Sequence, residues 1–318
     1  MQGNKIYSLT HQISNSPNSL SPTKKAYLQL HTSVVLWGFT AILGRLITLK
    51  EVPLVWYRVL ITCVALICLP GVYKQVKTTP RKGALKLAGI GCLVCIHWVC
   101  FYGSIKYSNV SIALSCLATT SFMASIIEPL FNKKKIKLYE LSLGLLIIPG
   151  IIIIVHVSEL FVTGIVLGLV SALFAAIFTV LNKMVIDDHH PQGMTFIELG
   201  SGFIFLSIIM PFYLHLFPGT NMHPGTGDWT YLIILGVCCT TLPFVLALHA
   251  LKHLSAFAST LTVNLEPVYG ILLAIPIFHE NKDLDWMFYL GTGIILLAVF
   301  IHPLLKRRFG EKRVIELL

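Results

Sequence analysis

Ten apolar stretches, each about as long as a membrane-crossing helix, run through the chain and are joined by short connections. A helix needs about 20 predominantly apolar residues to cross the hydrocarbon layer of a bilayer. The longest connection, residues 216–228, is too short to form a soluble domain. We therefore predict ten membrane-spanning helices. They lie near residues 27–48, 53–73, 84–104, 109–131, 138–156, 161–183, 194–215, 229–251, 255–278 and 286–304.

Charged residues are too few for a soluble protein of this length. They make up 12% of the chain, against 55% hydrophobic residues, whereas soluble domains carry about 25% charged residues. A globule could not hide so much apolar surface from water, so the predicted fold class is an all-α membrane protein. Residues 1–26 are polar and lack the apolar core of a signal peptide. We expect them to form a disordered cytoplasmic tail, and residues 305–318 to form a basic one.

The positions of the positive charges indicate the orientation of the chain. If the N-terminus is cytoplasmic, 19 of the 24 Lys and Arg residues fall on cytoplasmic segments, four fall outside, and Arg58 lies within a span. Lys and Arg concentrate in the cytoplasmic loops of membrane proteins. We therefore predict a multi-pass protein of the cell (inner) membrane with both termini in the cytoplasm. The net charge of +10 then suits a membrane surface, and no nucleic-acid partner is expected.

The second half of the chain repeats the first weakly but in order. Because each repeat holds five spans, an odd number, the second must cross the membrane in the opposite sense to the first. Inverted repeats of this kind are typical of secondary transporters, with a substrate site between the two halves. The predicted repeats are residues 27–156 and 161–304. The aligned segments are 36–47 with 174–185, 104–113 with 250–259, and 131–144 with 278–291.

Several motifs resemble the drug/metabolite transporter superfamily, EamA type, in its ten-helix form. They are "LWGFTAILGR" in span 1, Arg58 shortly after Pro53, "FYGSIKYSNVSIA" between spans 3 and 4, and "LEPVYGILLAIPIFHE" in span 9. The resemblance implies a central cavity formed by spans 1–4 and 6–9, with spans 5 and 10 at the periphery. It also implies alternating access between the two sides of the membrane. The chain departs from the family by having Thr119-Thr120 where a proline is usual.

Glu266 and Pro267 interrupt an otherwise apolar span near its middle. A charged residue at a helix centre costs roughly 2.5–3.5 kcal/mol on insertion scales, so we expect Glu266 to face protein or a water-filled cavity, or to be protonated. Pro267 has no N–H, so the carbonyl of Val263 loses its helical partner and the helix should kink. With Asn264, this predicts a substrate or proton site at mid-depth. The alternative is a buried structural glutamate beside an ordinary kink.

Other polar and aromatic residues within the spans are weaker candidates. Arg58 could pair with a carboxylate of the protein or substrate, or its side chain could reach the outer interface. His97 could bind substrate or serve as a hydrogen-bonded packing residue. The aromatic residues Trp98, Tyr102 and Trp37 could stack on a planar substrate or pack against lipid.

Arg45 and Lys183 occupy equivalent positions at the ends of spans 1 and 6 in the two repeats. They could act as gate charges at opposite mouths of one pathway, or simply extend to the interfaces. Gly164 and Gly168 form a GxxxG motif that indicates tight helix packing, either within the bundle or in a homodimer.

The sequence therefore predicts a secondary transporter that moves small metabolites, amino acids or drug-like compounds, and we expect the direction to be outward. Its partners would be the substrate, the bilayer and, in one alternative, a second copy. No cofactor or metal is expected, because nucleotide-binding, haem and zinc motifs are absent from the sequence. Two alternatives stay open: an integral membrane enzyme acting on lipids, and a non-transporting membrane scaffold. Polar residues at mid-depth disfavour both alternatives, and the chain is not expected to be an enzyme.

Overall fold

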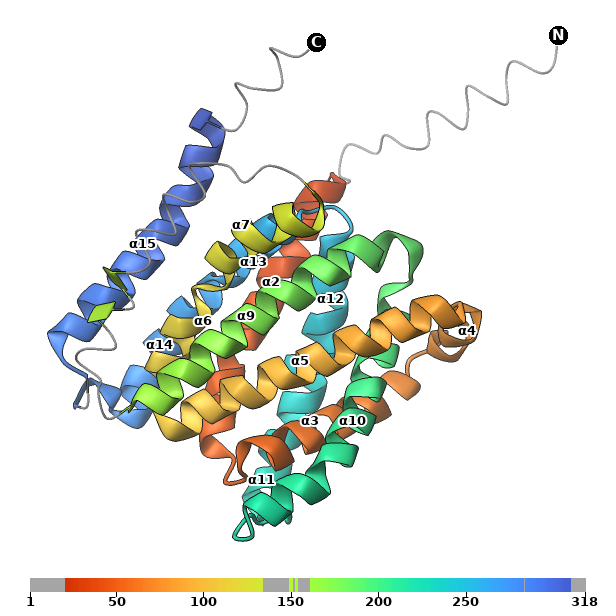
Figure 1. The fold of residues 1–318 in the computed structure, drawn as a ribbon, viewed down its shortest axis with the longest axis horizontal. Helices are drawn as coiled ribbons and strands as arrows, with labels where there is room; N and C mark the ends of the chain where they lie inside the picture. The colour runs from red at the N-terminus through yellow and green to blue at the C-terminus, as the bar shows by residue number, and fades with distance from the viewer. Residues whose placement is uncertain (1–20, 134–148, 151, 154–160, 283, 310–318) are drawn as a thin grey trace.

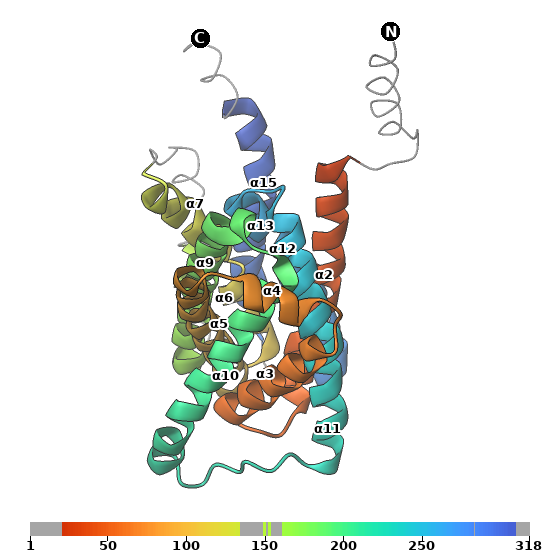
Figure 2. The same cartoon turned by 90° about the vertical axis from the view of Figure 1, so that its right-hand side faces the viewer.

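The computed structural model describes residues 21–133, 149–150, 152–153, 161–282 and 284–309. Within these residues the regular elements are helices, most of them packed side by side in one bundle (Figure 1). The start of α2 (Pro22–Leu46) and the end of α15 (Trp286–Phe309) lie at the same end of the bundle (Figure 2). The other α-helices are α3 (Glu51–Ile67), α4 (Val72–Thr78), α5 (Arg81–Tyr107), α6 (Val110–Leu117), α7 (Thr120–Phe131), α9 (Val162–Val185), α10 (Pro191–Leu216), α11 (Thr226–Ile233), α12 (Leu242–Leu251), α13 (Ala256–Val263) and α14 (Leu265–Phe278), with a π-helix at Ile234–Thr241 between α11 and α12.

Seven helical segments of the described chain are long and apolar enough to cross a membrane, or eight if α3 and α4 count as one bent span. This confirms the prediction of an all-helical membrane protein. The predicted span 138–156 lies mostly outside the described residues, and in α15 the apolar stretch is the shorter Trp286–Ala298. The count of ten spans therefore stays a prediction. α15 lies at the edge of the bundle (Figure 1).

Helix α2 begins at Pro22, earlier than the expected start of span 1 at residue 27. Ser21 caps it by accepting a hydrogen bond from the amide of Lys24, and proline is well suited to the first helical position. The end of the predicted tail is therefore helical. Residues 1–20 and 310–318 lie outside the described residues.

The prediction of a second span at residues 53–73 is wrong at its C-terminal boundary. α3 ends at Ile67, and α4 leaves it at an angle of 98°. Pro70 cannot donate a backbone hydrogen bond, and Gly71 adopts a left-handed conformation with φ of 87°, which a glycine tolerates. Tyr73 on α4 is 78% exposed, as expected of a helix that has turned away from the bundle.

Two spans are interrupted at equivalent positions of the two repeats. α6 and α7 are separated at Ala118-Thr119, and α13 and α14 are separated at Asn264, 146 residues after Ala118. Each of these spans is followed by a residue with a left-handed backbone, Lys133 (φ 53°) and His279 (φ 55°), again 146 residues apart. Backbone breaks at the same place in both halves support the two-repeat architecture. The break at Asn264 lies where a kink was expected from Pro267.

Glycines bring several helices of the bundle into backbone contact. A Cβ atom on Gly91 of α5 would lie 1.9 Å from the carbonyl oxygen of Glu198 on α10. On α9, the motif Gly164/Gly168 packs against Ser108 and Cys116, where added Cβ atoms would lie 2.5 and 2.7 Å from their Cβ atoms. The GxxxG motif therefore serves packing within one chain.

Candidate functional site: a central cavity between the repeats

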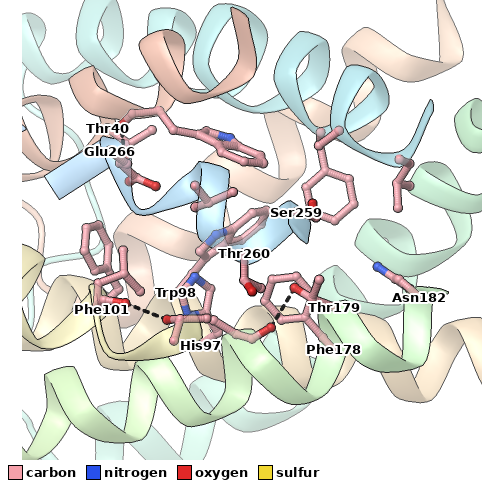
Figure 3. Close-up of a pocket in the computed structure, with 18 of the residues that line it drawn as sticks. Thr40, His97, Trp98, Phe101, Phe178, Thr179, Asn182, Ser259, Thr260 and Glu266 are labelled. Atoms are coloured by element: carbon pink, nitrogen blue, oxygen red, sulfur yellow. Dashed lines mark hydrogen bonds between the residues drawn. The ribbon is translucent and has the colours of Figure 1, made fainter. Parts of the chain in front are cut away.

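A cavity of about 110 Å³ lies inside the bundle and takes its walls from both repeats. The first repeat contributes residues of α2, α3, α5, α6 and α7, and the second contributes residues of α9, α12, α13 and α14. Figure 3 shows it extending from Glu266 and Thr40 at one end to Asn182 at the other. The lining residues are Trp37, Thr40, Arg58, His97, Trp98, Phe101, Leu117, Thr120, Ala175, Phe178, Thr179, Asn182, Phe244, Ala247, Leu248, Leu251, Ser259, Thr260, Val263 and Glu266.

Glu266 stands in the first turn of α14, directly after the break at Asn264. It is 6% exposed and lines the cavity, so the carboxyl group faces protein and cavity space instead of lipid. Thr40 of α2 lies within hydrogen-bonding reach of it (Figure 3). The positive charge of Arg58 on α3 also acts on it. The break places this acid at the wall of the cavity, because α13 and α14 meet there.

Arg58 is 2% exposed and does not extend to the interface. Its Nε donates to Thr240 Oγ1 at 2.8 Å, and its Nη1 donates to Tyr102 Oη at 2.8 Å. The guanidinium lies 3.9 Å from the centroid of the Trp98 ring, a cation–π contact. Thr240 belongs to the π-helix, a rare geometry that often occurs at functional sites. Arg58 is therefore held by both repeats with its charge at the cavity wall.

Tyr102 does not line the cavity but keeps Arg58 in place, and Gly44 makes room for it. A Cβ atom at Gly44 would lie 2.2 Å from Cε1 of Tyr102.

We expect Gly44→Ala to displace the Tyr102 ring from Arg58 and to lower the free energy of unfolding by about 1–3 kcal/mol, measured by thermal unfolding in detergent. Gly200→Ala is the control, because no atom lies within 4 Å of a Cβ there. Equal unfolding temperatures for the two variants would contradict the contact.

His97 and the two tryptophans line the cavity as predicted candidates. Nδ1 of His97 lies 2.9 Å from the carbonyl oxygen of Ser171 and 2.8 Å from its Oγ. Its ring also packs against Phe178, with centroids 5.4 Å apart. His97 is therefore hydrogen-bonded like a packing residue, and it also lines the cavity, where a substrate could reach it. Trp98 is 6% exposed, and Trp37 is half-buried.

The remaining candidates lie outside the cavity. Asn264 donates from Nδ2 to Ser121 Oγ at 2.6 Å, which joins the two interrupted spans. Arg45 is exposed at one end of the bundle, and Lys183 donates from Nζ to the carbonyl oxygen of Leu251 at 2.9 Å near the other. The structure therefore keeps the two gate candidates apart. Pro267 is buried beside Glu266.

Sequence reasoning did not single out several wall residues: five hydroxyl groups and three phenylalanines. Hydroxyl residues in an apolar span usually bond to their own helix, as Thr179 does to the carbonyl oxygen of Ala175 at 2.8 Å. Their facing the cavity depends on the rotation of each helix, which sequence alone does not give. They are Thr40, Thr120, Thr179, Ser259, Thr260, Phe101, Phe178 and Phe244.

Carboxylates tie the two repeats together at the end of the bundle opposite Pro22. Asp228 of α11 accepts from the amide of Thr48 at 2.9 Å and from its hydroxyl at 2.6 Å. Glu51 of α3 accepts from Tyr213 Oη at 2.7 Å. Both acids are buried, 3% and 8% exposed. Each bond joins one repeat to the other, so this end is held closed.

A third carboxylate closes the same end beside α6. Glu280 accepts from the amides of Val110 and Ser111 at 2.9 and 3.0 Å and from the Ser111 hydroxyl at 2.6 Å. An acid is favourable at a helix N-terminus, where backbone N–H groups lack partners. In addition, Lys106 Nζ donates to the carbonyl oxygen of Ile47.

Comparison with known proteins agrees with this architecture. The profile of the EamA-like transporter family matches residues 24–156 and again residues 162–302. The chain belongs to the EamA-like transporter family. It is therefore a multi-pass membrane protein of a transporter family, and the resemblance seen in its motifs is confirmed.

Relatives of this EamA-like protein are also named as transporters. An uncharacterized transporter, YxxF, of Bacillus subtilis (strain 168) is 26% identical over 307 residues, which cover 93% of this chain and 95% of the relative. An uncharacterized transporter of Archaeoglobus fulgidus is 24% identical over 282 residues, 87% of this chain and 98% of the relative. One crystal structure, at 14% identity, has a TM-score of 0.63 and covers 89% of this chain and 98% of its own, which shows a shared fold.

Proposed function

We propose that this EamA-like protein is a secondary transporter that exports small amphipathic metabolites, such as amino acids or drug-like compounds, by alternating access. The observation that carries the proposal is the cavity itself. Its walls come from both repeats, and they include a buried acid and a buried cation. Hydrogen bonds between the two repeats hold one end of the bundle closed.

The cavity wall combines one carboxyl group, one guanidinium, several hydroxyl groups and aromatic rings. Aromatic side chains supply large apolar contacts, and a few polar groups fix the orientation of a ligand. A molecule with an apolar body and charged or polar ends suits this wall. An amino acid with an apolar side chain has these properties.

The closed end is the one that the charge distribution predicts to be outside. The cavity extends from Glu266 toward Asn182 and Leu251, near the end predicted to be cytoplasmic. Loading from the cytoplasm, followed by release when the carboxylate bonds of the outer end open, is the cycle that we propose.

Glu266→Gln is expected to slow transport about 10- to 100-fold, because hydrogen bonds to charged groups contribute about 1.5–3 kcal/mol. A thermal-shift screen of the amino acids and of small organic cations on purified protein first finds a stabilising compound. Counterflow of that compound in proteoliposomes then compares the variant with wild type. Glu128→Gln is the matched control, since it removes the other Glu-Pro carboxylate, which does not line the cavity. An unchanged rate in Glu266→Gln would remove the acid from the mechanism.

The topology is tested by labelling. Lys133 and Lys282 stand at similar positions of the two inverted repeats, so cysteines placed there should react from opposite faces of the membrane. In cells that express Lys133→Cys or Lys282→Cys in a background without native cysteines, an impermeant maleimide should label only residue 282. Equal labelling of both would contradict the inverted arrangement.

A further inference from the structure

Another buried acid, Glu198, lies within the bundle and outside the cavity wall. It stands on α10, eight residues into a helix of 26 residues, and it is 0% exposed. The backbone of α10 is packed at this point against Gly91 of α5. Intramembrane acids are costly and usually functional, so its surroundings indicate what it does.

The side chain of Glu198 meets the amide of Asn182, which is 2% exposed and forms the far end of the cavity (Figure 3). Asn182 Nδ2 donates to Glu198 Oε2 at 3.5 Å. The two other oxygens of this pair, Glu198 Oε1 and Asn182 Oδ1, are buried and have no hydrogen-bond partner among the described residues. Both are acceptors when the acid is ionised, so neither can satisfy the other.

One added proton would satisfy both oxygens if Oε1 is turned toward Asn182 Oδ1. A protonated Glu198 would donate from Oε1 to Asn182 Oδ1, while Asn182 Nδ2 donates to Oε2, which closes a ring of two hydrogen bonds. Without the proton, a buried carboxylate and a buried carbonyl oxygen each lose a partner, and each unsatisfied group costs about 1–3 kcal/mol or more. We propose that Glu198 and Asn182 form a proton-binding site behind the cavity, separate from Glu266.

The neighbouring charges do not supply an alternative partner. Glu198 is fully buried, and the Asn182 amide is the hydrogen-bond donor to its carboxyl group. The titratable groups on the elements packed around α10 are engaged with other partners, face other groups or lie exposed in the described chain. They include Glu51 and Arg58 on α3, Lys74 and Lys77 on α4, Lys86, Cys95 and His97 on α5, Lys183 on α9 and His249 on α12.

The geometry suits a proton better than a metal cation. A hard cation such as Ca²⁺ takes six or more oxygen ligands, whereas this site offers two unpaired oxygens. A proton needs only one donor oxygen and one acceptor oxygen.

Loss of the proton would change the cavity. Asn182 Oδ1 would again lack a partner, so the amide would have to turn or admit water from the cavity side, where it forms the wall. Proton binding at Glu198 would thereby change the orientation or hydration of the Asn182 amide, which lines the cavity at the end near Leu251. The use of this linkage to drive transport rests on the proposed function, whereas the proton site does not.

Infrared spectroscopy of the purified protein in detergent, titrated with pH, tests the site. Wild type should show the carbonyl stretch of a protonated carboxylic acid, which disappears at high pH. Glu198→Gln should lose the component of this band that comes from Glu198 and still fold, because an amide can pair with Asn182 in the same ring, whereas Glu266→Gln should keep that component. In Asn182→Ala the acid loses its acceptor, so the band should shift to the higher frequency of a weakly bonded carboxyl. A Glu198→Gln spectrum equal to wild type at every pH, or an unshifted band in Asn182→Ala, would overturn the proposal.

Proteoliposomes test the coupling. With a compound found by thermal shift, Glu198→Gln should still be stabilised by that compound, but its transport should no longer respond to an imposed pH gradient. A full response in the variant would overturn the coupling. If wild type transports none of the compounds that stabilise it, the proposed function fails, and the infrared result still decides the proton site.

Discussion

Replacing Arg58 with Met is expected to destabilise the protein by about 3–5 kcal/mol and to abolish transport. We expect the buried guanidinium to act on Glu266 as an opposite charge across the cavity wall, and removing one partner of such a pair leaves the other charge uncompensated, at about this cost. Arg58 is 2% exposed and acts on Glu266, which shares its cavity wall. The same change removes the donors to Thr240 and Tyr102 and the cation–π contact with Trp98.

A double variant separates the charge effect from the loss of packing. Arg58→Met with Glu266→Gln removes both charges, so it should recover a large part of the lost stability without recovering transport. Unfolding in detergent measures the coupling of the two changes. Arg45→Met is the control, because Arg45 is exposed. If the two changes simply add, the two groups do not interact in the folded protein.

Gly91→Ala is expected to separate α5 from α10 and to cost about 1–3 kcal/mol or more, as overpacking does in a filled core. The added Cβ would lie 1.9 Å from the carbonyl oxygen of Glu198 and 2.6 Å from its carbonyl carbon. Backbone atoms cannot move aside as a flexible side chain can, so the helices themselves must shift.

Gly89→Ala gives a matched comparison on the same helix. Gly89 is exposed, and a Cβ there meets no atom within 4 Å. Alanine is the better helix former by about 1 kcal/mol, so this variant should be as stable as wild type or more so. Thermal unfolding and the yield of monodisperse protein measure both effects. Similar behaviour of the two alanine variants would contradict the close packing of α5 and α10.

The helical membrane fold, the family and the wall position of Glu266 could be predicted from sequence. Length and apolarity determine what crosses a bilayer, and an acid followed by proline in the middle of a span has few tolerable environments. The bend after Ile67 was missed because Cys68, Leu69 and Val72 continue the apolar run, although Pro70-Gly71 is a turn signal.

The contacts that hold the site together could not be predicted in the same way. The partners of Arg58 come from residues 44 and 182 positions further along the chain, and only the packed helices bring them together. Glu198 did carry a signal, since it is an acid in the predicted span 194–215, but it was not singled out. The identity of its partner depends on how α9 and α10 are rotated.

The bond from Asn264 to Ser121 joins two spans that are both interrupted near mid-depth. Four half-helices therefore meet around one polar contact, and a tilt of any one of them acts on the others. We expect the half-helices on the two sides of the membrane to pivot together about the contact at Asn264. Opening of the bundle at one end would then close it at the other end, without any change in the length of a helix.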